Sequence, residues 1–138
     1  MAEVKTGLED IIVGQQDICY IDGDKGDLYY RGYHIDELAP QATYEEIVYL
    51  LWHNKLPDKR ELKILNERLI TRRKLHEDHL RVIQSMPKNA RPMSVLRTGV
   101  SEIGLYDPEK LTFDQETTLL KADDILAKMP TIAAAIDR

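Results

Sequence analysis

Residues 7–39 read GLEDIIVGQQDICYIDGDKGDLYYRGYHIDELA, and this stretch decides how the fold begins. Two strand-like runs, Ile18–Ile21 and Leu28–Tyr30, flank a five-residue turn, Asp22–Gly26, whose two glycines tolerate positive φ. A further β-branched run lies at Ile11–Val13. The pattern predicts a small β-hairpin that leads into the start of a helix. Because two short strands are marginally stable alone, the hairpin must pack on a helical body.

The rest of the chain carries helix signals. Thr43 with Glu46, and Asp58 with Glu61, match the capping box that begins a helix. Apolar residues then recur at helical spacing after each box. We therefore expect a mainly α protein, with the β-hairpin segment in residues 1–40 and about five helices in residues 43–138. The expected helices cover residues 43–54, a stretch that begins at 58, and residues 77–86, 92–104 and 114–137.

The last two expected helices have unusual compositions. Gly99 lies inside one helix, where glycine costs about 1 kcal/mol relative to alanine, and close approach of another helix would explain it. The other helix has an apolar stripe wider than a surface helix of a small monomer needs. Pro130 lies within that helix, so we expect a kink near residues 126–130. The stripe comprises Leu119, Ala122, Leu126, Met129, Ala133 and Ile136, with Ile125 and Ile132 at its edge.

Length and composition limit the class of protein. A chain of 138 residues with 43% hydrophobic and 31% charged residues fits one globular domain. The net charge of −5 and a basic run limited to Arg72–Lys74 argue against a nucleic-acid partner. The sequence has no apolar run of about 18 residues, so no membrane partner is expected. A single cysteine, Cys19, excludes an intrachain disulfide and favours the cytoplasm.

Two charged motifs are candidate metal sites. His76 and His79 enclose two acids in the motif HEDH, but zinc proteases place their histidines four residues apart. An exposed polar helix start explains HEDH better. The motif DGDKGD at residues 22–27 lacks the oxygen ligand at position 5 and the later glutamate of a calcium loop. We therefore predict no metal site.

The remaining reactive side chains suggest no catalysis. Cys19 lies mid-strand without a nearby histidine and is expected to be a packed core thiol. His34 is expected in a turn, and His53 at a helix end, where it suits the negative end of the dipole. The residues themselves thus predict no catalytic, cofactor-binding or metal-binding position within 1–138.

Six blocks of the sequence carry a further signal. They are GLED at 7–10, YIDGDKG at 20–26, YYRGYHIDELA at 29–39, YEEIVYLLWHNKLP at 44–57, PMSVLRTGVSEIG at 92–104 and AKMPTIAAA at 127–135. In this order the blocks resemble the citrate synthase family of the bacterial and archaeal type. Arg91 departs from that pattern, because many members have histidine before Pro-Met. The resemblance implies that residues 1–138 are the amino-terminal part of a largely helical large domain.

The resemblance also implies an activity. Family members condense acetyl-CoA with oxaloacetate to citrate and CoA, a step of the tricarboxylic acid cycle, and close relatives use propionyl-CoA to form methylcitrate. They need no cofactor beyond the acyl-CoA co-substrate. Two histidines and an aspartate carry the proton transfers, and arginines bind the carboxylates. All of these lie in the second half of the family sequence, so none is carried over to residues 1–138, and the chain alone is predicted to be inactive.

The resemblance finally implies partners. The segments near 92–104 and 114–137 resemble family helices that pack against their copies across a homodimer, and a carboxy-terminal half would complete the enzyme. An ordinary intrachain core is the other explanation of Gly99 and the wide stripe. The alternative function is a non-catalytic helical dimerisation or interaction module.

Overall fold

The computed structural model describes residues 16–107 and 114–136, and its chain divides into two compact units, Met1–Leu56 and Pro57–Arg138. Helices dominate the described residues, which confirms the mainly α class. The β-branched run at residues 11–13 lies outside the described residues. Assignment of residues 1–138 to one large domain stays a prediction.

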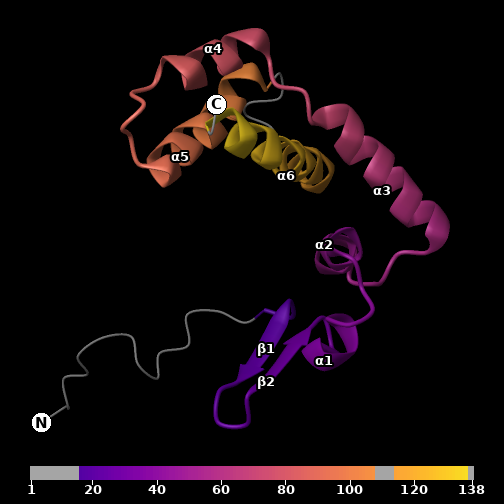
Figure 1. Cartoon of the computed structure of the whole chain (residues 1–138). Coiled ribbons are helices and arrows are strands. Elements are labelled where there is room, and N and C mark those ends of the chain that lie inside the picture. Colours follow the sequence, from indigo (N-terminus) through magenta and orange to yellow (C-terminus); the bar gives the residue numbers. More distant parts are fainter. Residues whose placement is uncertain (1–15, 108–113, 137–138) are drawn as a thin grey trace, which may run out of the picture. The chain divides into compact units, whose positions relative to one another are not determined.

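The first unit contains the expected hairpin and one strand that was not expected (Figure 1). Strands β1 (Cys19–Asp22) and β2 (Asp27–Tyr30) pair antiparallel, and β3 (Tyr33–His34) continues the sheet in the order β1-β2-β3. Of the two glycines in the first turn, only Gly26 adopts a positive φ, at +77°. Its N–H donates to the Asp22 carbonyl over 2.8 Å and closes the turn.

Two helices follow the sheet in this unit. The short α1 (Ile35–Leu38) precedes α2 (Tyr44–His53). The capping box expected at α2 is confirmed: Thr43 Oγ1 accepts from the Glu46 N–H, and Glu46 Oε2 accepts from the Thr43 N–H over 2.7 Å. On α2, Val48 and Leu50 are buried, whereas Tyr44 in its first turn is exposed.

Arg31 ties the sheet to α2. Its φ is +48°, and its guanidinium donates to the Asp17 carboxylate over 2.6 Å and to the Leu51 carbonyl over 2.9 Å. The second bond satisfies one of the carbonyls that a helix end leaves without an intrahelical donor. The turn between β2 and β3 is thus held on the last part of α2.

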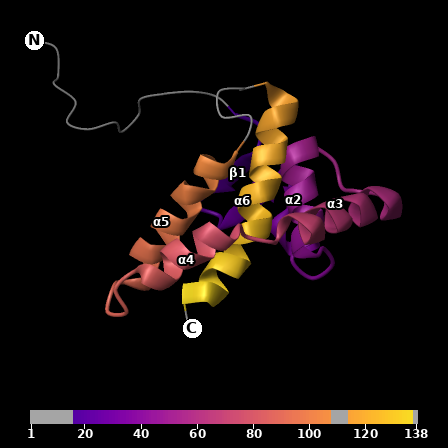
Figure 2. The same ribbon diagram turned by 90° about the horizontal axis from the view of Figure 1, so that it is seen from above.

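The second unit is helical throughout its described residues. It contains α3 (Lys59–Arg72), α4 (Glu77–Ser85), α5 (Pro92–Ile103), the short 3₁₀ helix η1 (Gly104–Tyr106) and α6 (Gln115–Ile136). The long α6 packs on α3, α4 and α5, and Figure 2 shows it running beside α4 and α5. The buried core of this unit comprises Leu75, Ile83, Val95, Ile103 and Ile132. None of the described helices has the length and apolar character needed to cross a membrane.

The ends of these helices largely match the sequence signals. Asp58 accepts from the N–H groups of Arg60 and Glu61, so it caps α3 as expected. For the last helix the sequence offers Thr112 or Asp114 as the cap; Asp114 accepts from the N–H of Thr117, and Thr112 lies outside the described residues. The end expected at residue 104 is confirmed, because α5 stops at Ile103 and Gly104 is its C-cap. The φ of Gly104 is −62°, so this glycine does not adopt the left-handed conformation common after helices, and the chain continues into η1. Pro130 lies inside α6, and the kink stays a prediction.

Gly99 explains how closely α5 and α6 approach. A Cβ placed on Gly99 would lie 2.9 Å from Cγ2 of Ile132 on α6 and 3.5 Å from Cδ1 of Ile83 on α4. Close approach of another helix is therefore confirmed, and the neighbours belong to the same chain. An ordinary core within the chain therefore explains why position 99 is a glycine, because the missing side chain makes room for Ile132.

Within the chain, only part of the expected apolar stripe of α6 is buried. Asp123, Ala127 and Ile132 are the buried residues of α6, and Ile132 is an edge position of the stripe, whereas Met129 and Ile125 are each 41% exposed. Asp123 is buried because Arg68 of α3 meets it, with Nε 2.7 Å from Oδ2. A charged residue at a core position interrupts the hydrophobic pattern, so periodicity alone does not identify the face that packs inside the chain.

Candidate functional site

The candidate site lies where the chain enters α4. His76 precedes the helix and its Nδ1 accepts a hydrogen bond from the Asp78 N–H over 3.3 Å, so the imidazole is the N-cap. Leu75, just before it, is buried in the core of this unit. Burial of Leu75 fixes the position of the cap and therefore the direction of α4.

His79 departs from the sequence expectation. The motif HEDH was expected to be an exposed polar helix start, which holds for His76 but is wrong for His79, only 2% exposed. His79 and Ile83 are four residues apart and share the inward face of α4. The polar neighbours at 77 and 78 conceal this, because they point to the other side of the helix.

Glu102 and Tyr106 complete a cluster that sequence reasoning missed. Glu102 on α5 is 8% exposed, and its Oε2 lies 3.5 Å from Nε2 of His79. The Tyr106 ring stacks on His76 with centroids 4.8 Å apart, and lies nearly parallel to His79 at 6.0 Å. The only indication of this cluster in the sequence is the position of Glu102. It follows Val95 by seven residues, about two helical turns, so both lie on the same face of the helix.

The surroundings of Tyr106 in this cluster change the pKa of its hydroxyl. Desolvation of the Tyr106 hydroxyl, reinforced by the negative charges of Glu102 and Asp78, raises its pKa above the ordinary value. The phenol therefore stays neutral at physiological pH and serves as a hydrogen-bonding and stacking group. It offers no phenolate for nucleophilic chemistry.

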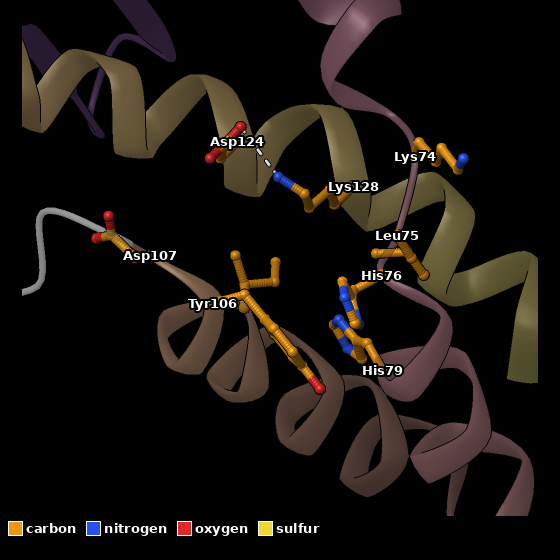
Figure 3. Close-up of a pocket in the computed structure, with 9 residues that line it drawn as sticks. Lys74, Leu75, His76, His79, Tyr106, Asp107, Asp124 and Lys128 are labelled. Atoms are coloured by element: carbon orange, nitrogen blue, oxygen red, sulfur yellow. Dashed lines mark ion pairs between the residues drawn. The ribbon is translucent and has the colours of Figure 1, made fainter.

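A cavity of about 320 Å³ opens beside this cluster. Figure 3 shows His76, His79 and Tyr106 together at one part of it, with Asp107 farther away and Lys128 beside Asp124. Lys128 pairs with Asp124 over 3.0 Å, and Asp124 also accepts from Arg72 over 2.7 Å. The lining comprises Lys74, Leu75, His76, His79, Ile103, Tyr106, Asp107, Asp124 and Lys128.

The chemistry available in this cavity is limited. No group of three His, Cys, Asp or Glu side chains within residues 16–107 and 114–136 is arranged to hold a metal ion. Among the described residues that line the cavity, none is a serine, threonine or cysteine that His79 could activate as a nucleophile. What remains is the buried imidazole of His79 beside the Glu102 carboxylate.

The structure also places the other residues considered from sequence. Cys19 is half-buried, so the packed core thiol is wrong, because β1 lies at an edge of the sheet. His34 belongs to β3 and caps α1 rather than lying in a turn, and it meets Asp27 over 3.4 Å. His53 is at the end of α2 as expected and stacks on Tyr49.

Comparison with known proteins gives the family. A family model described as citrate synthase, C-terminal domain, matches residues 7–138. The chain is 43% identical to citrate synthase of Haloferax volcanii over 99% of its own length and 37% of that protein. It is 36% identical to 2-methylcitrate synthase 2 of Corynebacterium glutamicum, over 96% of this chain and 34% of that protein.

A solved structure agrees with the sequence relatives. The citrate synthase of Thermoplasma acidophilum, in a ternary complex with carboxymethyl coenzyme A and oxaloacetate, aligns with a TM-score of 0.87 at 25% identity, covering 99% of this chain and 36% of that one. The chain belongs to the citrate synthase family, and it spans about a third of the length of the relatives it matches.

Proposed function

We propose that this chain is the amino-terminal part of an enzyme that condenses acetyl-CoA with oxaloacetate to citrate and CoA. The observation that carries the proposal is 43% identity to a citrate synthase along 99% of the chain. The helical arrangement supports it, because 99% of the chain aligns with a citrate synthase whose complex holds a CoA derivative and oxaloacetate.

The proposal assigns the chemistry to sequence outside residues 1–138. Citrate formation removes a proton from the acetyl methyl group, joins that carbon to the oxaloacetate carbonyl, and hydrolyses the thioester with water. These steps need an acid, a base and groups that bind carboxylates. The most enclosed candidate, His79, faces Glu102 in the helical core, where Gly99 and Ile132 pack. We therefore assign no catalytic residue to this chain and expect it to be inactive alone.

Residues 92–104 and 114–137 supply the proposed homodimer contact. On α5, Met93 is 72% exposed, and on α6 the stripe of Ile125 and Met129 is also exposed. A groove of about 340 Å³ lies between the two helices and is lined by Val100, Gly104 and Ile125 among others. Apolar faces of this kind mark protein contacts, and a second copy would cover both helices. Location in the cytoplasm stays a prediction from the single cysteine.

A fusion tests the proposed activity. Residues 1–138 replace the matching third of the Haloferax volcanii enzyme, and release of the CoA thiol is measured with acetyl-CoA and with propionyl-CoA, each in the presence of oxaloacetate, at low and at high salt. We expect CoA release that depends on oxaloacetate. The comparison of the two acyl-CoA substrates also gives the preference, which the similarity to both citrate and 2-methylcitrate synthases leaves open.

Two controls make the fusion decisive. The remaining two-thirds of the Haloferax enzyme alone should release no CoA, and the intact enzyme gives the upper limit. A fusion that is folded and dimeric by circular dichroism and sedimentation, yet releases no CoA, would contradict the proposal. That outcome would favour the alternative function, a non-catalytic helical dimerisation module.

A further inference from the structure

The buried pair His79 and Glu102 joins two helices through ionisable groups. Nε2 of His79 on α4 and Oε2 of Glu102 on α5 are 3.5 Å apart, and both side chains are more than nine-tenths buried. Within the described residues neither atom makes a hydrogen bond. A buried carboxylate therefore lies beside a buried imidazole, an arrangement that is most favourable when both groups are charged.

The charged groups around this pair are held by other partners. From α6, Lys128 pairs with Asp124, and Asp124 also binds Arg72 of α3. At the start of α4, His76 faces Asp78, and from η1 the neutral Tyr106 lies over both imidazoles. Among the described residues, the other charged groups that line the adjoining cavity are Lys74 and Asp107, and Asp107 meets Lys121 over 3.3 Å.

We infer that His79 and Glu102 form a proton-dependent link between α4 and α5, strong while the imidazole is protonated and weak once it loses the proton. Imidazoles change charge between about pH 5 and 8. After deprotonation the buried Glu102 carboxylate faces a neutral ring, so the contact between α4 and α5 is destabilised. His79 also lines the adjoining cavity. The inference is independent of the proposed function.

A double-mutant cycle at two pH values tests the link. His79→Phe keeps an aromatic ring against Tyr106 without a titrating group, and Glu102→Gln keeps the shape without the charge. The two single variants, the double variant and the unmodified chain are unfolded with denaturant at pH 5.5 and pH 8.5. We expect the coupling between the two positions to change the folding equilibrium by about tenfold at pH 5.5 and by less than about twofold at pH 8.5.

A matched pair on the same helix controls for general effects of pH. His76 Nδ1 and Asp78 Oδ2 are also 3.5 Å apart, but each side chain is 57% exposed. The cycle of His76→Phe and Asp78→Asn should give a coupling below about twofold at both pH values, because exposed pairs are screened. Coupling of His79 with Glu102 that is equal at the two pH values, or no larger than the control, would overturn the inference. If residues 1–138 do not unfold cooperatively, the same variants are measured in the Haloferax fusion, with the same outcomes.

Discussion

Ile132 of α6 lies against Gly99 of α5 so closely that a Cβ on the glycine would be 2.9 Å from Cγ2 of the isoleucine. Ile132 is fully buried, and Ile83 and His79 of α4 adjoin the same point. Because the neighbours of Ile132 leave it little freedom to shift, the spacing of the three helices depends on the missing side chain at position 99.

Gly99→Ala should therefore destabilise the chain although alanine is the better helix former. The propensity gain of about 1 kcal/mol opposes an overpacking cost of about 1–3 kcal/mol. We expect the free energy of unfolding, measured by chemical denaturation, to fall by about 1 kcal/mol. Gly104→Ala is the control, because nothing lies within 4 Å of its Cβ position and its φ is −62°. It should leave stability unchanged or raise it, and equal losses at both positions would refute the packing argument.

The ion pair between Arg68 and Asp123 should contribute more to stability than the adjacent ion pair between Arg72 and Asp124. Asp123 is fully buried and receives Arg68 Nε at 2.7 Å, whereas Asp124 is about one-third exposed and meets Arg72 at the same distance. Asp123→Ala leaves Arg68 without its carboxylate, and we expect a loss of about 2–3 kcal/mol in unfolding free energy. Asp124→Ala should cost about 1 kcal/mol or less. If thermal or chemical denaturation gave similar losses of stability for Asp123→Ala and Asp124→Ala, burial would not explain the contribution of Asp123.

The pH dependence of stability should include a contribution from Asp124. Desolvation acts to raise the pKa of Asp124, but hydrogen bonds and positive charges from Arg72 and Lys128 outweigh it, so the pKa lies below the ordinary value. A lowered folded-state pKa stabilises the fold above the ordinary carboxyl pKa of about 3.9, and this stabilisation is lost as the pH falls through the folded value. The difference in Tm between the unmodified chain and Asp124→Asn should thus shrink as the pH falls from 6 to 2.5. A difference that is constant over this range would exclude the effect.

The apolar face of α6 should govern self-association. Ile125 is 41% exposed on α6, and Ile64 is 50% exposed on α3. We expect Ile125→Glu to shift the chain from dimer to monomer in sedimentation experiments, because a charge would then be buried at the contact. Ile64→Glu adds the same charge outside the proposed contact and should leave the association unchanged. Dissociation by both variants, or by neither, would argue against this face.

Local signals in the sequence predicted much of the fold. Caps are made within one turn of the chain, so Thr43, Asp58 and Asp114 could be recognised without any tertiary information. The hairpin pairing of Cys19 with Tyr30 follows from the turn between them. Gly104 shows the limit of such signals, since a glycine permits the left-handed conformation but does not require it.

The sequence by itself determined the family, the helical class and the places where helices begin, because these depend on residues close together in the chain. Only the tertiary structure decided which side of α6 is buried and that His79 is enclosed. Asp123 could be buried only because Arg68, 55 residues away, reaches it. His79 likewise lies inside because Gly99 leaves space beside its ring and Glu102 supplies a charge opposite it. A polar side chain is stable in the core when distant residues compensate it, and no local pattern records that compensation.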